Sequence, residues 1–125
     1  MSENEDRFEN YINEVESGTT CEDFLDDGKQ LLENIRTNTK AQKEFKIYKA
    51  LGHKLRYHIY KMLERKPMCT CALAKLFQKP DSSITYHLKI LQDANLIIGQ
   101  KQGYFTVYYA REKFLNQISD QKEKI

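Results

Sequence analysis

Apolar residues recur every three or four positions through most of this chain, which is the spacing of an amphipathic helix. Gly52, Pro67 and Pro80 interrupt the pattern, because glycine ends helices in the left-handed conformation and proline cannot continue the hydrogen-bond ladder. Gly28 marks a point at which the first helix could be interrupted, and the polar residues 37–43 fit either a linker or a continuing helix. The pattern predicts helices over residues 21–36, 45–51, 54–65, 71–77, 81–95 and 111–122.

The period of the pattern changes after the fifth of these helices. Residues 96–101 and 104–110 are rich in Ile, Val, Tyr and Phe, and Gln102 and Gly103 join them, as in a β-hairpin with glycine in its turn. The two short helices before the hairpin meet at a tight polar turn, which is the helix-turn-helix arrangement. We therefore expect a mainly α fold with a small β-hairpin, a winged helix-turn-helix in which the hairpin is the wing.

The length of 125 residues suits one compact domain with an arm. Residues 1–20 are rich in Glu, Asn and Ser with few apolar anchors, and this composition predicts an acidic, mobile N-terminal arm. Residues 21–44 follow as an N-terminal helical extension. Residues 45–122 then form the winged helix-turn-helix domain and its C-terminal helix.

The last predicted helix carries a weak apolar stripe, made of Phe114, Leu115 and Ile118. A stripe this small does not stabilise a helix alone. We therefore expect a homodimer, formed through the N- and C-terminal helices of two subunits.

Charge divides the chain more sharply than its net value of +2 indicates. Residues 1–44 hold 12 acidic and 5 basic side chains, a balance of −7, whereas residues 45–125 hold 6 acidic and 15 basic, a balance of +9. The basic part is the candidate for a polyanionic partner. A stretch rich in charged residues is more often only a surface exposed to solvent. A sequence motif therefore has to support the assignment of a polyanionic partner.

Several function classes find no support in the sequence. No apolar run approaches the roughly 20 residues that span a bilayer, and the acidic start is unlike a signal peptide, so we expect no membrane contact and a cytoplasmic location. Three cysteines are too few for the disulfide framework of a secreted domain, and reduced thiols are the default. Without a glycine-rich phosphate loop or a cluster of acid, base and nucleophile, we expect no enzyme. A thiol oxidoreductase built on Cys69 and Cys71 is the one catalytic alternative.

An ordered set of segments resembles the ArsR/SmtB family of winged-helix repressors, which is named for its arsenical and zinc sensors. The segments read ALGH at 50–53, MCTCALA at 68–74, SSITYHLKIL at 82–91, DANLI at 93–97 and VYY at 107–109. Each segment alone is weak evidence, but together they follow the family's spacing from about residue 47 to 119. The acidic extension before residue 44 lies mostly outside the resemblance.

The resemblance implies that helix 81–95 enters the major groove of duplex DNA, where each base pair displays a distinct pattern. Lys89 is expected on a phosphate, which fixes register without reading sequence. Asp81 either accepts a hydrogen bond from a cytosine amine or caps the helix, and the cap is the favoured interpretation. The candidate DNA-binding residues are Asp81, Ser82, Ser83, Thr85, Tyr86 and Lys89 on the helix, and Lys101, Gln102 and Tyr104 on the wing.

The three histidines are expected to be structural. His87 follows the family pattern and is predicted to close the helix-turn-helix. His53 and His58 are predicted to be surface or capping residues.

Cys69 and Cys71 match the paired-cysteine motif with which sensors of this family bind thiophilic ions. Soft thiolates select As(III), Cd, Pb or Zn over hard cations. Residues two apart point about 200° apart on a helix, so both sulfurs reach one ion only if the helix begins between or after them. Two thiolates are too few for a tight site, and Cys21 is the remaining thiol. Some sensors of the family draw a ligand from this N-terminal region, sometimes across the dimer, so our hypothesis is a three-thiolate site of Cys21, Cys69 and Cys71.

Two other interpretations of the cysteine pair stay open. Free cysteines are often small buried hydrophobes, and a redox sensor would need thiols of low pKa. The zinc site that relatives form on their last helix needs histidines, and residues 111–125 contain none, so we treat that site as absent.

The sequence thus predicts a homodimeric repressor that binds an inverted-repeat operator, with its recognition helices about one DNA turn apart. No cofactor is required, and a thiophilic ion acts as the inducer. The alternatives are a DNA-binding regulator without a metal response and a winged-helix protein-interaction module. DNA binding that falls steeply with salt favours a regulator.

Overall fold

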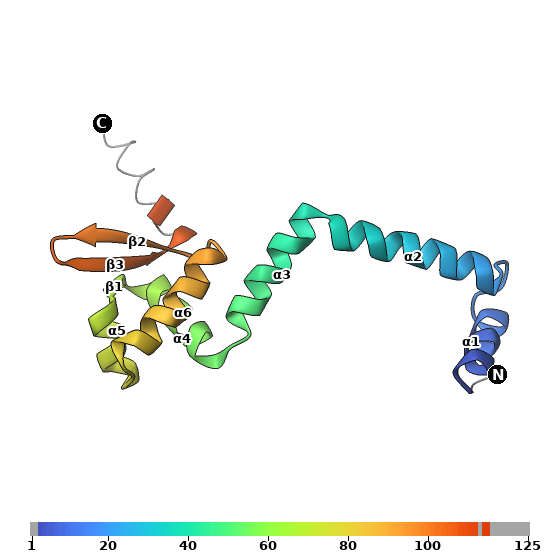
Figure 1. The fold of residues 1–125 in the computed structure, drawn as a ribbon, viewed down its shortest axis with the longest axis horizontal. Coiled ribbons are helices and arrows are strands. Elements are labelled where there is room, and N and C mark those ends of the chain that lie inside the picture. The colour runs from blue at the N-terminus through green and yellow to red at the C-terminus, as the bar shows by residue number, and fades with distance from the viewer. Residues whose placement is uncertain (1–2, 113, 116–125) are drawn as a thin grey trace. The chain divides into compact units, whose positions relative to one another are not determined.

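The structure of the 125-residue chain is a computed structural model, and it describes residues 3–112, 114 and 115. The chain divides into two compact units, residues 1–42 and 43–125. Figure 1 shows the elements in chain order: α1 (Glu3–Glu14), α2 (Cys21–Thr37), α3 (Thr39–Leu51), α4 (Lys54–Arg65), β1 (Met68–Cys69), α5 (Thr70–Phe77), α6 (Asp81–Asp93), β2 (Ile97–Gln102) and β3 (Phe105–Ala110). In the part that is described, no helix is long and apolar enough to cross a bilayer.

The N-terminal unit contains a helix where composition predicts a mobile arm. Within residues 1–20, α1 packs on α2, because Phe8 and Tyr11 meet the ring of Phe24 edge-on at centroid distances of 5.8 and 6.0 Å. Ile12 is 2% exposed. These few apolar anchors are enough to hold a helix, since aromatic side chains bury large areas.

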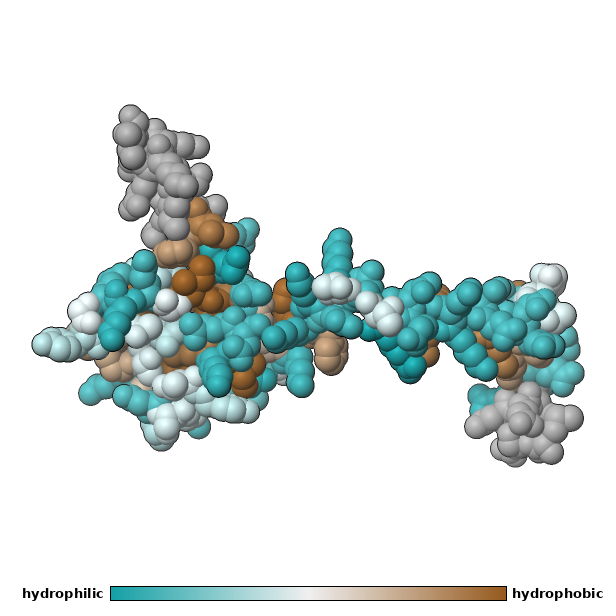
Figure 2. Space-filling view, turned by 45° about the horizontal axis from the view of Figure 1, so that its top comes forward, coloured by the Kyte–Doolittle hydropathy of each residue, from teal (hydrophilic) through white to brown (hydrophobic). Residues whose placement is uncertain are grey.

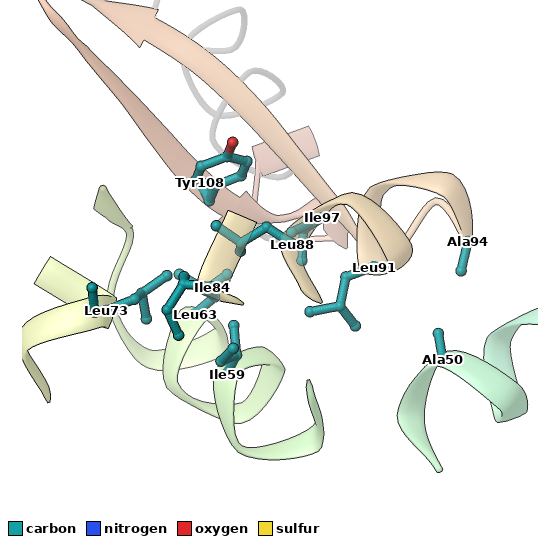
Figure 3. Close-up of a cluster of buried hydrophobic side chains, with 11 residues drawn as sticks. Ala50, Ile59, Leu63, Leu73, Ile84, Leu88, Leu91, Ala94, Ile97 and Tyr108 are labelled. Atoms are coloured by element: carbon teal, nitrogen blue, oxygen red, sulfur yellow. The ribbon is translucent and has the colours of Figure 1, made fainter. Parts of the chain in front are cut away.

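The winged domain is built around a core that α4, α5, α6 and the hairpin share (Figure 3). Each of its large aliphatic side chains is worth roughly 1.5–3 kcal/mol when fully buried. The six largest fully buried side chains are Ile59, Leu63, Leu73, Ile84, Leu88 and Leu91. The core therefore fixes the place of α6 relative to the helices before it.

The sheet has three antiparallel strands in the order β1-β3-β2. Gly103, with φ of 63°, turns the hairpin between β2 and β3, as the sequence predicts. The sequence analysis did not predict β1, whose two residues pair as Met68 with Tyr108 and Cys69 with Val107. Two residues are too few to show an alternation of apolar and polar positions. This strand is recognised only by its pairing with β3, which the sequence does not reveal.

The other predicted elements that the structure describes agree with it to within two residues at each end, except that α3 begins at Thr39 rather than at residue 45. The α4 helix spans the predicted residues, and α3 ends directly before Gly52. The polar stretch 37–43 resolves into a break at Asn38 followed by the start of α3, and Gly28 does not interrupt α2. Residues 111, 112, 114 and 115 are helical, and the rest of the predicted C-terminal helix, including Ile118, lies outside the described residues.

Candidate nucleic-acid interface and thiol pair

The α6 helix turns one face to the core and a polar face to solvent. Burial of Ile84, Leu88 and Leu91 sets the rotation of the helix about its axis. Of the predicted DNA-contacting residues on α6, Ser83 is half-buried and the others are exposed, namely Asp81, Ser82, Thr85, Tyr86 and Lys89. Tyr86 is 62% exposed, which leaves most of its aromatic ring accessible to a partner.

Asp81 does not cap α6, contrary to the interpretation that the sequence favours. The N-cap is Pro80, with φ −61° and ψ 150°, and no side-chain cap hydrogen bond is made there. The Pro80 carbonyl accepts from the N–H groups of Ser83 and Ile84 at 3.1 and 3.2 Å. The extended Pro80 takes the cap position, and Asp81 is the first residue of the helix. The exposed Asp81 carboxylate lies in the first turn, where the helix dipole favours negative charge.

Arg56 of α4 connects α6 to the end of α3. Its Nε donates to the Ala50 carbonyl at 2.7 Å, and its Nη1 lies 3.2 Å from Nδ1 of His87. His87 is only 8% exposed, and its ring centroid lies 4.7 Å from that of His53. Burial and then the nearby charges of His53 and Arg56 lower the pKa of His87. A neutral imidazole can accept from the guanidinium, so His87 has a structural contact, but with α4 and its cap residue rather than within the helix-turn-helix that it was predicted to close.

The two remaining histidines lie at the start of α4 and on its surface. Nδ1 of His53 accepts from the backbone N–H of Leu55 at 3.2 Å and so caps α4, as predicted. His58 is exposed. Both border a hollow of about 500 Å³ whose polar lining is His53, Lys54, His58, Lys79, Ser83 and His87. This basic hollow adjoins the N-terminal end of α6.

The wing places its predicted residues at the tip of the β2–β3 hairpin. Lys101 is exposed, and Tyr104 is 100% exposed. Gln102 instead donates from Nε2 to the hydroxyl of Tyr109 at 2.8 Å, across the hairpin. In this structure the Gln102 amide therefore supports the wing.

Cys69 and Cys71 meet where β1 ends and α5 begins. Cys69 is the last residue of β1 and also the N-cap of α5, whose first helical residue is Thr70. The helix thus begins between the two cysteines, which meets the geometric condition for both sulfurs to face one ion. Their Sγ atoms are 2.7 Å apart, and Cys69 Sγ accepts from the Ala72 N–H at 3.4 Å.

The environment of the pair favours one thiolate. The hydrogen bond from the Cys71 thiol, followed by that from the Ala72 N–H, lowers the pKa of Cys69. The same contact with Cys69 raises the pKa of Cys71. Cys71 is exposed and Cys69 is half-buried, so the sulfurs are open to solvent.

Cys21, the third predicted ligand, belongs to the other compact unit, where it begins α2 and is half-buried. Across the described residues, no three His, Cys, Asp or Glu side chains of the chain gather into a group that could hold a metal. One winged domain therefore contributes two thiols, Cys69 and Cys71, to the predicted three-thiolate site.

Comparisons with known proteins agree on one family. Residues 53–98 match the bacterial regulatory protein arsR family. The chain is 34% identical over 80 residues to an HTH-type transcriptional regulator of Methanocaldococcus jannaschii, covering 63% of this chain and 90% of the relative. It is 36% identical over 72 residues to the arsenical resistance operon repressor of Bacillus subtilis, covering 57% of this chain and 69% of that protein. The chain belongs to the arsR family. It is a transcription regulator, and neither the family nor these relatives are enzymes.

Solved structures show the same fold for this arsR-family protein. An ArsR-like transcriptional regulator from Rhodococcus covers 70% of this chain and 82% of its own, with 24% identity and a TM-score of 0.57. The homodimeric winged helix-turn-helix DNA-binding domain from Mycobacterium bovis covers 70% of this chain and 83% of its own, with 17% identity and a TM-score of 0.57. The fold is a winged helix-turn-helix.

Sequence reasoning missed Arg56, which joins three helices of this regulator. A signal was available, because Arg56 stands three and seven residues before the buried Ile59 and Leu63 and so shares their face of α4. An arginine on that face needs acceptors. The acceptors themselves were not predictable, since His87 lies 31 residues away in sequence.

Proposed function

We propose that this regulator represses transcription by binding an inverted repeat in duplex DNA as a homodimer, and that a thiophilic ion at Cys69 and Cys71 releases it. One observation carries the proposal: the thiol pair lies at the junction of β1 and α5. One side of the junction is hydrogen-bonded to β3 of the wing, and the other is the first helix of the helix-turn-helix. An ion bound there acts on the wing directly and on α6 through α5, the helix that precedes it in the helix-turn-helix.

The DNA-binding surface we propose is the polar face of α6 with the tip of the wing. The exposed hydroxyls and amine of α6 suit major-groove edges and phosphates. Lys54, Lys79 and Ser83 of the basic hollow suit a phosphate next to the start of α6. Two relatives, from Bacillus subtilis and Staphylococcus xylosus, are arsenical resistance operon repressors. The polar surface of α6 and the wing, together with these two relatives, supports the proposal that the chain binds an operator and represses transcription.

The inducer we propose is arsenite, cadmium, lead or zinc. Thiolate is the ligand that such soft ions prefer, and the lowered pKa of Cys69 makes its deprotonation easier. Two sulfurs leave the ion short of a ligand, and Cys21 is the remaining thiol in the chain. We propose that Cys21 of the same or the second subunit completes a three-thiolate site.

Release follows from the double role of Cys69. Its sulfur accepts from the Ala72 N–H and so caps α5, while its backbone pairs with Val107 of the wing. An ion that draws Cys69 and Cys71 toward a third thiolate competes with this cap and shifts the start of α5. A coupling of about 1–3 kcal/mol between the ion and DNA, typical of allosteric pairs, is enough for a switch.

The homodimer is proposed from the apolar surface that the winged domain leaves exposed. Phe45 and Tyr48 of α3 are 67% and 65% exposed, and Leu115 in the helical turn after β3 is exposed as well. Leu115 belongs to the C-terminal helix expected to pair with a second subunit, α3 is the helix that precedes the helix-turn-helix, and the Mycobacterium bovis domain is homodimeric. A cytoplasmic location follows from a DNA partner.

The DNA-binding proposal is tested by fluorescence anisotropy on DNA from upstream of the chain's own gene. We expect affinity to fall steeply with salt, because phosphate contacts release counterions. Lys89→Ala should weaken binding and reduce the magnitude of the log–log salt slope by about 1.

The matched control for this experiment is Lys61→Ala, because the Lys61 amine already pairs with Glu64 at 2.7 Å. We expect the control to keep the affinity and salt slope of the unmodified chain. Equal slopes for both variants would remove Lys89 from the interface. A chain that binds no duplex DNA would instead be a protein-interaction module.

A further inference from the structure

The α2 helix carries an apolar stripe that its own unit leaves exposed. Contact with α1 occurs near the start of α2, where Phe24 meets Phe8 and Tyr11. No residue of α2 is buried. Leu25, Leu31, Leu32 and Ile35 are 45%, 62%, 45% and 52% exposed, and Figure 2 shows apolar side chains along α2 among polar ones. Exposed leucines on one helix face indicate a partner.

The stripe is symmetric about Gly28. Its members fall at equal distances on either side of that glycine, so each apolar residue has an apolar counterpart. The pairs are Cys21 with Ile35, Phe24 with Leu32, and Leu25 with Leu31. Two copies of α2 laid antiparallel around a two-fold axis at Gly28 would therefore bring Leu25 against Leu31 and Cys21 against Ile35 of the second copy. Phe24 keeps its own contacts with Phe8 and Tyr11 and borders Leu32 of the second copy. An isologous contact of this kind uses one surface on both subunits.

Gly28 itself is not explained by the contacts of its own chain. A glycine in a helix interior costs about 1 kcal/mol relative to alanine. A Cβ added at Gly28 would meet nothing within 4 Å, so no neighbour in the described residues requires its absence. At the centre of an antiparallel helix pair, a residue without a side chain lets the two backbones approach closely.

The charges of α2 select the antiparallel orientation. Its first half holds Glu22, Asp23, Asp26 and Asp27, whereas its second half holds Lys29, Glu33 and Arg36. Parallel copies would align the two acidic halves. Antiparallel copies align each acidic half with the partner's basic half and also oppose the two helix dipoles.

We propose that two copies of this chain pair through α2, antiparallel about Gly28. The occupant of the stripe is the α2 helix of a second subunit. This contact goes beyond the proposed function, because it lies outside residues 53–98, which match the family, and requires neither DNA nor an ion. The inference depends on the proposed homodimer only for the presence of a second subunit. It adds a contact that the winged domain alone does not provide.

Charged residues placed on the stripe test the pairing in the full chain. Leu31→Glu with Leu32→Glu should raise the dimer dissociation constant at least tenfold in sedimentation equilibrium. The matched control adds the same charge on the opposite, exposed face of α2, through Gln30→Glu with Asn34→Glu, and should change it less than twofold. Equal dissociation constants for both variants would overturn the proposal, provided that circular dichroism shows equal helix content.

Thiol cross-linking tests the orientation without DNA or metal, so its outcome is separate from that of the DNA-binding experiments. The background chain carries Cys69→Ser and Cys71→Ser, which leaves Cys21 as its one thiol. A bifunctional maleimide that spans the roughly 8–10 Å between packed helices is the probe. Antiparallel pairing separates the two copies of Cys21 by about 21 Å along the axis, from 14 residues at 1.5 Å each, so this background should stay uncross-linked.

Adding Ile35→Cys to the background should give a covalent dimer, because the new thiol faces Cys21 of the partner subunit. Adding Asn34→Cys instead, on the other face of α2, should not. Cross-linking of the background chain itself would show parallel pairing, and cross-linking of neither Ile35→Cys nor the background would show that α2 does not pair. Either result overturns the antiparallel dimer.

Discussion

At the scale of single residues, Arg56 and His87 hold the recognition helix in place. The guanidinium contacts backbone carbonyls at the end of α3 and the imidazole of α6, so one side chain of α4 joins three helices. Such hydrogen bonds are worth most where both partners are shielded from water. The position of the exposed polar face of α6 therefore depends on Arg56 and His87, which are not among the predicted DNA-binding residues.

Replacing Arg56 should destabilise the winged domain. Arg56→Ala leaves the Ala50 carbonyl and His87 Nδ1 without this donor, and we expect a loss of about 1–3 kcal/mol in the free energy of unfolding. Urea denaturation followed by circular dichroism measures it. Arg65→Ala, an exposed position in the last turn of the same helix, is the control and should cost less than about 1 kcal/mol. Equal losses would show that the Arg56 contacts add nothing.

The lowered pKa of His87 predicts the pH dependence of stability. Because the folded protein disfavours the charged ring, the unfolded chain binds more protons below the unperturbed pKa of about 6.5. The contribution of His87 is therefore complete above that pH and is lost as the pH falls through the folded-state pKa. Urea denaturation between pH 7.5 and 5 should show this loss in the unmodified chain and a flatter profile in His87→Gln. Parallel profiles would contradict the assignment.

At the scale of elements, the junction of β1 and α5 is both a helix start and the proposed ligand site. The cap and the ligand functions of Cys69 can be separated by substitution. Cys69→Ser keeps an N-cap acceptor, so stability should change little while ion binding is lost. Cys69→Ala removes both, and we expect it to cost about 0.5–2 kcal/mol in addition. Urea denaturation and titration with cadmium distinguish the two variants. Undiminished cadmium affinity in Cys69→Ser would remove Cys69 from the site.

The elements also show how far sequence reasoning reaches. Helices with local stop signals, such as α4 before Pro67 and α3 before Gly52, were predicted from periodicity and glycine or proline alone. The hairpin was predicted from the change in the spacing of apolar residues after α6. The α1 helix and β1 were not predicted, because each is held by a partner distant in sequence: Phe24 for α1 and β3 for β1.

The candidate site was predictable in part for the same reason. The exposed face of α6 follows from helix periodicity, and the start of α5 between Cys69 and Cys71 satisfies the condition derived from the helix period. The Asp81 cap failed because a single residue decides where a helix begins. The Arg56–His87 contact joins residues that no local pattern connects.

At the scale of the whole molecule, the division of charge follows the division into units. Residues 1–44 carry a balance of −7 and residues 45–125 one of +9, and the compact units meet at residues 42 and 43. The basic unit contains the winged domain and its thiol pair. The acidic unit contains the α2 stripe and Cys21. The proposed DNA-binding surface and the proposed α2 contact thus lie in different parts of the chain.

The most direct test of the account is the effect of arsenite, cadmium and zinc on DNA binding by the reduced chain, measured by anisotropy on its upstream DNA. We predict that at least one ion weakens binding by about 5- to 150-fold, the range of typical allosteric couplings. A chain with Cys69→Ser and Cys71→Ser should bind DNA as tightly and ignore every ion. Tight binding by the unmodified chain that no ion alters would contradict the proposed release and leave a regulator without a metal response.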